Sequence, residues 1–213
     1  MKIGEKMPIL RNSEIDSLAV NAVAELMAAS ARTAPKGGGV DNTSTAVLTG
    51  NEKDELADAM ERRQEKKRTP AGIFARDAEG VRKSQAVLLI GVRGTMPKRT
   101  SKGEPLNCGA CGYETCGQFM TATKKKGEDF TGPNCIFEAL DLGIALGSAV
   151  KTASTMNIDN RIMYTVGAAA KDLELLDADV IIGIPLSATG KNPFMDRKCV
   201  NLFFFFGPLS AYD

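Results

Sequence analysis

With 213 residues, 43% of them hydrophobic, the chain can bury one sizeable core, and we expect a single domain over residues 1–213 that needs no disulfide bonds. Lys and Arg number 27 and Asp and Glu 26, a balance that excludes the broad basic surface of a nucleic-acid-binding protein. No stretch approaches the roughly 20 apolar residues of a membrane span, and the first residues lack the apolar core of a signal peptide, so we expect a cytoplasmic protein.

The first half of the chain alternates between helical and strand-like patterns. Apolar residues recur at helical spacing after a predicted cap at Ser13 and stop before Pro35, which predicts a first helix. Residues 86–92, AVLLIGV, form a short apolar run that suits a buried strand. Between them the patterns predict a strand over 44–50 and a helix with a charged outer face over 53–67. The alternation predicts an α/β (α+β) fold.

The second half contains a long apolar helix, predicted over residues 134–156 and typical of a core or an interface. Gly143 and Gly147 lie on one face of this helix and would let another backbone approach closely. Three further elements are expected: a helix over 161–176, a buried strand over 179–186, and a strand-like segment over 200–206. The last contains four consecutive phenylalanines, and is either a final sheet strand or an arm packed on a second subunit.

Three of the five cysteines lie in the stretch NCGACGYETCGQF, residues 107–119, and Cys135 follows after a short gap. In a reducing cytoplasm, clustered cysteines hold metal or carry out redox chemistry more often than they form disulfides. Four thiolates can occupy the corners of a cubane iron-sulfur cluster when the chain folds back on itself. The glycines beside the cysteines suit this role, since a chain wrapped around inorganic sulfide favours positive φ angles; they are Gly109, Gly112 and Gly117. Cys116 is expected to open a helix that runs to about Lys126.

Zinc is the main alternative, because four cysteines can also form a tetrahedral site. Structural zinc sites usually present two Cys-x2-Cys pairs, whereas the second half here consists of a lone Cys116 and a lone Cys135. A catalytic cysteine would need a base, and the chain has no histidine. The spacing favours a cluster over zinc and over a disulfide, and it leaves Cys199 as a thiol without a role.

The cysteine motif resembles the small iron-sulfur domain of the corrinoid iron-sulfur protein of the acetyl-CoA pathway and of the B subunit of the Rnf electron-transport complex. The resemblance implies a 4Fe-4S cluster bound by Cys108, Cys111, Cys116 and Cys135. It also implies that residues 104–136 form an inserted cluster-binding segment.

The remainder of the chain is similar to nitroreductase-like flavoproteins. The segment before one of their core strands resembles AASARTAPKGGGVDNTSTAVLTG in this chain, and their central dimer helix resembles ALDLGIALGSAVKTA. Their last core strand and the basic loop after it correspond in place to DADVIIGIPLSATGKNPFMDRK. As a whole, the chain resembles a family described as ferredoxin-domain-containing proteins of unknown function. This implies a nitroreductase-like sheet with flanking helices, a small inserted iron-sulfur segment and a homodimer.

The same resemblance implies bound FMN, although the motifs that hold it differ here. ILRNSEID places Arg11 and Ser13 out of register with the usual Arg-x-Ser-x-Arg, and Asn42-Thr43-Ser44 replaces Gln-Pro-Trp. The residues chemically suited to the FMN phosphate are Arg32, Lys36, Gly37, Gly38, Gly39, Lys191 and Arg197. Alternatively, PKGGG only ends a helix, and Arg32 is a solvated side chain.

These features predict an iron-sulfur redox protein that relays electrons between a 4Fe-4S cluster and FMN, acting on an unknown substrate. The alternatives are a ferredoxin-like electron carrier or cluster-holding subunit without flavin, and a zinc-stabilised interaction module. No acid/base or nucleophile set is recognisable, so we assign no catalytic residues. A basic rim would steer an acidic electron-transfer partner such as ferredoxin, unless it is only a solvated face; it consists of Lys98, Arg99, Lys102 and Lys124 to Lys126.

Overall fold

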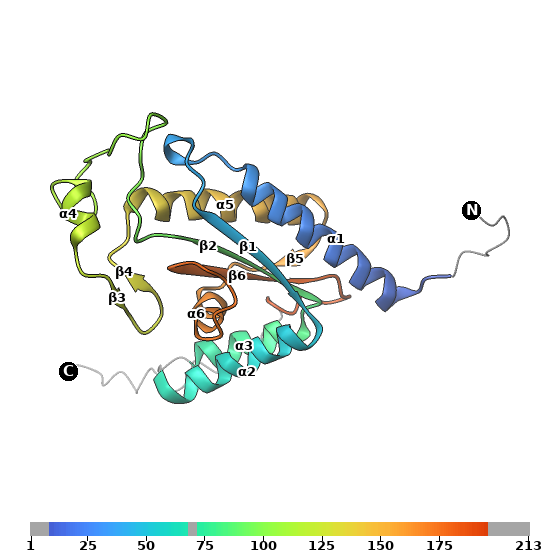
Figure 1. The fold of residues 1–213 in the computed structure, drawn as a ribbon. Coiled ribbons are helices and arrows are strands. Elements are labelled where there is room, and N and C mark those ends of the chain that lie inside the picture. Colours follow the sequence, from blue (N-terminus) through green and yellow to red (C-terminus); the bar gives the residue numbers. More distant parts are fainter. Residues whose placement is uncertain (1–8, 68–71, 196–213) are drawn as a thin grey trace, which may run out of the picture.

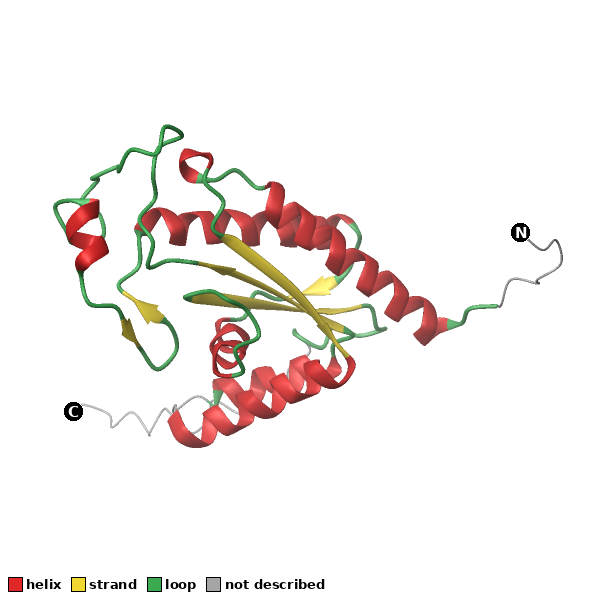
Figure 2. Cartoon of the chain, viewed as in Figure 1, coloured by secondary structure: helices red, strands yellow, loops and turns green. Residues whose placement is uncertain are grey.

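The computed structural model describes residues 9–67 and 72–195 (Figure 1). Its centre is a four-stranded antiparallel sheet in the order β1-β2-β6-β5, formed by Thr43–Thr49, Ala86–Val92, Val180–Ser187 and Asp159–Asn160. Helices α1 (Asn12–Thr33) and α5 (Ile136–Thr155) cover one face, and α2 (Gly50–Lys67), α3 (Ile73–Lys83) and α6 (Tyr164–Asp172) cover the other (Figures 1 and 2). The predicted α+β class, a sheet with flanking helices, is confirmed.

Strand β2 explains why both faces of the sheet need cover, because all seven of its residues are buried. Successive side chains of a strand point to opposite faces. Leu88 and Ile90 accordingly join the core under α1 and α5, and Val87 and Leu89 join the core under α2, α3 and α6. The uninterrupted apolar run thus predicts the central strand at the bounds that the structure shows.

Small residues set how closely the helices approach. Ser30 of α1 and Thr152 of α5 bring their hydroxyl oxygens within 2.7 Å, and alanines fill the contact around them. On the other face, a Cβ at Gly167 of α6 would lie 1.7 Å from the carbonyl oxygen of Ile181. Only glycine therefore lets α6 pack this closely on β6.

The structure corrects several element boundaries. Helix α1 is capped at Arg11, whose backbone N–H donates to Glu14, and not at Ser13. The predicted helix over 161–176 shortens to α6, which begins only after Met163 has paired with Gly183 of β6 and ends at Asp172. Helix α3, of 11 residues, and strand β5, of two residues, were not predicted. The segment 200–206 lies outside the described residues, and no helix that the structure describes is long and apolar enough to cross a membrane.

Between β2 and the start of α5, residues 93–134 extend beyond one end of the sheet; we call this segment the excursion. It contains α4 (Cys116–Thr121) and a small hairpin of β3 (Lys125–Lys126) and β4 (Thr131–Gly132), seen at the left of Figure 1. The buried Arg63 of α2 fixes the hairpin to the rest of the fold. Its guanidinium bonds the carboxylates of Asp129 and Asp172, and the Tyr164 hydroxyl also donates to Asp129. These bonds hold the excursion in one place against α2 and α6.

Candidate metal centre

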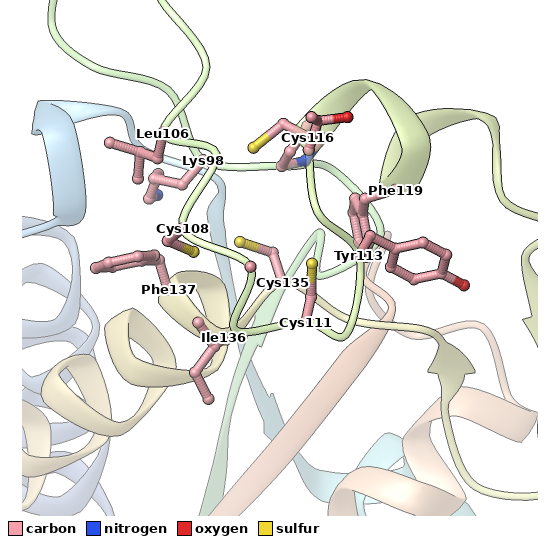
Figure 3. A pocket seen from close by; sticks show the side chains of 13 residues that line it. Lys98, Leu106, Cys108, Cys111, Tyr113, Cys116, Phe119, Cys135, Ile136 and Phe137 are labelled. Atoms are coloured by element: carbon pink, nitrogen blue, oxygen red, sulfur yellow. The ribbon is translucent and has the colours of Figure 1, made fainter.

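The excursion and the start of α5 together line one pocket that contains four cysteines: Cys108, Cys111, Cys116 and Cys135. In Figure 3 their sulfur atoms surround a common space, with Cys116 on the side of α4. Cys108 is exposed, Cys111 and Cys116 are half-buried, and Cys135 is buried. The structure thus brings together the four cysteines that the sequence singles out.

Local backbone structure positions each cysteine. Cys135 caps the N-terminus of α5, and its backbone N–H donates to the Gly94 carbonyl at 2.7 Å. Cys116 is the first residue of α4, directly after the cap residue Thr115, whose hydroxyl accepts from the Gln118 N–H at 3.2 Å. The Thr115 N–H in turn donates to the Gln118 side chain. Both cysteines therefore lie at helix N-termini. Thr115 and Gln118 fix the position of Cys116 locally, whereas Cys135 is held by a bond to the distant Gly94.

The glycines of the motif behave only partly as predicted. Gly109 and Gly112, on either side of Cys111, have φ angles of 72° and 86°, in the left-handed region that glycine adopts without steric cost. Gly117 instead lies inside α4. This helix ends at Thr121 and does not reach Lys126, because Lys125 and Lys126 pair with the strand at 131–132.

A contact between residues 107 and 116 was not foreseen from the sequence. The backbone N–H of Asn107 donates to Cys116 Sγ at 3.3 Å, and the backbone N–H of Cys116 donates to Asn107 Oδ1 at 2.8 Å. Asn107 has a φ of 46°. Asparagine tolerates this conformation better than most residues, and that preference is the one signal in the sequence that bears on it.

The four thiols fit the donor set of a 4Fe-4S cluster, which takes one cysteine at each of its irons. In such a cube the thiolates stand on separate corners, whereas a single zinc ion with Zn–S bonds of about 2.3 Å draws them to roughly 3.8 Å from one another. Within residues 9–67 and 72–195, no three His, Cys, Asp or Glu side chains converge closely enough to hold a single metal ion.

Aromatic residues form the wall of the pocket toward α4. Phe119 is fully buried, and the Tyr113 ring packs edge-on against it with 5.8 Å between centroids. The Lys124 ammonium lies 3.7 Å from the centroid of the Phe119 ring.

A buried group of three charges lies behind the pocket. Lys98, which also lines the pocket, places Nζ 3.0 Å from Glu138 Oε1 and 2.7 Å from Asp141 Oδ2, and donates to the Val40 carbonyl at 2.7 Å. The side chain of Lys98 is 0% exposed, so it does not belong to the basic rim predicted from the sequence. Arg99, Lys102, Lys125 and Lys126 are exposed, and Lys124 is half-buried.

Burial disfavours the charged forms of Glu138 and Lys98, and their hydrogen bonds outweigh this effect for Lys98 but not for Glu138. Burial raises the pKa of Glu138, against the hydrogen bonds that it accepts from Asn42 and Lys98. For Lys98, burial acts to lower the pKa, but its bonds to Asp141 and Glu138 outweigh this and raise it. The second oxygen of Glu138, Oε2, is buried and has no hydrogen-bond partner among residues 9–67 and 72–195.

The residues predicted to hold the FMN phosphate have internal partners. Arg32 pairs with Asp41 at 3.0 Å and donates to the Thr43 carbonyl, and Lys36 donates to three carbonyls at the end of α1.

The Gly37 N–H donates to the Asp141 carboxylate at 3.0 Å. Gly38 has a φ of 62°, and a Cβ there would lie 2.0 Å from the Arg99 carbonyl oxygen; Gly39 is exposed. The turn at 37–39 therefore packs on the excursion.

Lys191 is not near this turn within one chain. The turn leads into Thr43, which pairs with Val92 and so lies at the end of the sheet nearest the cysteine pocket. Lys191 follows Ser187, at the opposite end of β6, and strands of this length span about 20 Å. Arg197 and Cys199 lie outside the described residues.

Comparison with known proteins places the chain in a family. A family model described as "Uncharacterized protein containing a ferredoxin domain" matches residues 131–197, a range that includes Cys135. A protein of Archaeoglobus fulgidus, named an uncharacterized protein, is 48% identical over 189 residues, which cover 89% of this chain and 97% of that protein. The chain belongs to this ferredoxin-domain family. Its membership, implied by the sequence resemblance, is confirmed, and it supports a redox role in general.

Several solved structures are similar to this ferredoxin-domain protein at low sequence identity. The BluB-like flavoprotein of Clostridium difficile 630 is 14% identical, with 88% of this chain and 84% of that one covered and a TM-score of 0.49. The nitroreductase CinD of Lactococcus lactis, solved with nicotinic acid, is 14% identical over 88% and 87%, also with a TM-score of 0.49. The NADPH:FMN oxidoreductase of Vibrio harveyi is 12% identical over 91% and 70%, with a TM-score of 0.46.

Proposed function

We propose that this protein is an iron-sulfur redox protein whose 4Fe-4S cluster is held by Cys108, Cys111, Cys116 and Cys135. The observation that carries the proposal is that four thiols, three from the excursion and one from the start of α5, line one pocket. The residues 104–136 then act as the cluster-binding segment. Free thiols in this number also fit a reducing compartment such as the cytoplasm.

The residues of the chain would prepare this site for electron transfer. When bound, a 4Fe-4S cluster accepts and donates single electrons. Phe119 and Tyr113 exclude water from one side of the pocket, while Cys108 is exposed and leaves a short path to a partner. The Lys98 ammonium places positive charge behind the pocket, partly offset by Glu138 and Asp141. Exposed Lys102, Lys125 and Lys126 give the excursion positive charges, which supports an acidic partner such as ferredoxin.

Alanine variants of single cysteines test the ligand set. Cys116→Ala should lose most of the bound iron and acid-labile sulfide while keeping the α+β core folded, as judged by far-UV circular dichroism. Cys199→Ala is the matched control and should keep wild-type iron. Wild-type iron in Cys116→Ala, or iron loss in Cys199→Ala but not in Cys135→Ala, would refute the assignment. Zinc in place of iron and sulfide would support the zinc-stabilised interaction module instead.

A homodimer is a second part of the proposal, supported by an apolar surface on the outer side of α1 and α5. Ile15, Leu18 and Leu26 of α1 and Leu140 and Ile144 of α5 are between 45% and 56% exposed. In the part of the chain that the structure describes, nothing outside α5's own backbone lies within 4 Å of a Cβ built at Gly143 or Gly147, so a second backbone has room to approach there. Light scattering should give a dimer for wild type and a monomer for Leu140→Asp; Glu55→Lys on α2 serves as the control. A monomeric wild type would refute this part.

Electron exchange with FMN, acting as an oxidoreductase on an unknown substrate, is the more specific form of the proposal. Within one chain Lys191 and the 37–39 turn lie at opposite ends of the sheet, so an FMN that contacts both would bridge two copies. Acid-released FMN should then fluoresce in wild-type supernatants and be lost from monomeric Leu140→Asp. A cluster-loaded protein that retains no FMN, even after FMN is added, would favour the electron carrier without flavin.

A further inference from the structure

The loop that carries Cys108 and Cys111 is closed by two hydrogen bonds between the residues at its ends. The Asn107 N–H donates to Cys116 Sγ at 3.3 Å, and the Cys116 N–H donates to Asn107 Oδ1 at 2.8 Å. Among the hydrogen bonds of the described residues, the first is the one that ends on a cysteine sulfur. Cys116 is thus distinguished from the other three cysteines before any metal is considered.

The second bond explains how the first keeps its direction. Asn107 is exposed and has a φ of 46°, a conformation in which most side chains are strained. The amide oxygen of its side chain accepts the N–H at the start of α4, which ties residue 107 to the same turn that carries Cys116. This bond orients the backbone N–H of residue 107 toward the sulfur. An asparagine at this position therefore supplies both a tolerated positive φ and the acceptor.

We propose that Asn107 is a positioning residue for the iron-sulfur centre: it holds Cys116 in place and stabilises negative charge on its sulfur. The inference rests on the proposed function, because it requires that Cys116 binds the cluster. An N–H that donates to a cluster thiolate favours the more negative, reduced state and so raises the reduction potential. The two bonds also hold the Cys116 sulfur in one position, which slows its release and so the loss of iron.

Two substitutions of Asn107 separate its contributions. Asn107→Gly keeps the backbone N–H and permits the positive φ, but it lacks the acceptor that holds the N–H in place. Asn107→Asp keeps an acceptor of the same length. A hydrogen bond to a charged group is strong enough for its loss to shift an equilibrium by about tenfold. For a one-electron couple, a tenfold shift corresponds to about 59 mV.

The experiment uses anaerobically purified full-length protein with measured iron and sulfide content. The midpoint potential is measured by a dye-mediated redox titration, and the rate of iron loss is measured with a chelator. Asn107→Gly should shift the redox equilibrium toward the oxidised cluster by up to about tenfold, which lowers the midpoint potential by up to about 59 mV. It should also lose iron several-fold faster than wild type. Asn107→Asp should lose iron at the wild-type rate. Thr121→Ala is the control, because Thr121 is exposed at the far end of α4, donates to carbonyls of that helix, does not line the pocket and makes neither bond to Asn107.

The outcomes are distinct. An Asn107→Gly protein with wild-type potential and wild-type iron loss would overturn the inference, as would an equal shift of potential in Thr121→Ala. If Asn107→Gly binds no iron, Asn107→Asp decides: restored iron supports the inference, and failure to restore it overturns it. A wild-type protein without iron and sulfide would instead refute the proposed function itself.

Discussion

Removing the buried Lys98 should destabilise the fold more than any exposed charge would. Lys98→Met keeps the length of the side chain and removes its charge, so Glu138 and Asp141 face each other with no cation between them. The Val40 carbonyl also loses its donor. All three side chains are at most 4% exposed, so water does not replace the lysine.

The size of the effect follows from this burial. Removing one partner of a buried ion pair costs about 3–5 kcal/mol, since an uncompensated charge remains. In a chain of this length, 1 kcal/mol shifts the melting temperature by about 2–4 °C, so we expect a decrease of roughly 6–20 °C. Adding Glu138→Gln to Lys98→Met should recover part of the loss, because it removes one of the two unpaired carboxylates.

The assay is urea unfolding followed by circular dichroism on wild type, Lys98→Met and the double variant under identical anaerobic conditions. Lys102→Met is the matched control, since Lys102 is exposed on the same excursion, and its effect should stay within about 0.5 kcal/mol. A Lys98→Met protein that unfolds within about 1 kcal/mol of wild type would show that the lysine is not the counter-charge of this group.

Two predictions concern pH. Burial raises the pKa of Glu138 above its usual value of 4.5. The stability that this shift contributes is present below pH 4.5 and is lost as the pH rises through the pKa of the folded state. Glu138→Gln should remove this pH dependence of the unfolding free energy measured in urea. Burial of the Tyr164 hydroxyl, together with the neighbouring Asp129 carboxylate, raises the pKa of Tyr164 to about 12. The stability that this tyrosine contributes is therefore fully present below pH 10.0 and is lost as the pH rises from 10.0 to about 12. In an ultraviolet titration, Tyr164→Phe should abolish the phenolate step that occurs at the highest pH. A phenolate step at the ordinary pH would contradict the second prediction.

Local patterns were sufficient to predict the elements that are specified locally. The run AVLLIGV predicts β2 because a strand buried on both faces needs no polar positions. The cysteine pocket was predictable for a similar reason, since short spacing and a turn rich in glycine bring Cys108 and Cys111 together without help from distant residues. The helical period of α1 was also visible, but both of its sides are apolar, so the period alone did not show which side faces the sheet.

Features that depend on distant residues were missed or misread. Lys98 lies in the polar stretch PKRTSK and is buried only because α5 supplies Glu138 and Asp141. No local pattern of charge or hydrophobicity records such long-range pairings, and they decide the surroundings of the metal centre.

The most direct test of the central claim is an absorption spectrum of anaerobically purified protein before and after dithionite, with iron and acid-labile sulfide measured on the same sample. The account predicts a broad brown band that bleaches on reduction, with about four iron and four sulfide per chain. A colourless protein without sulfide would contradict it.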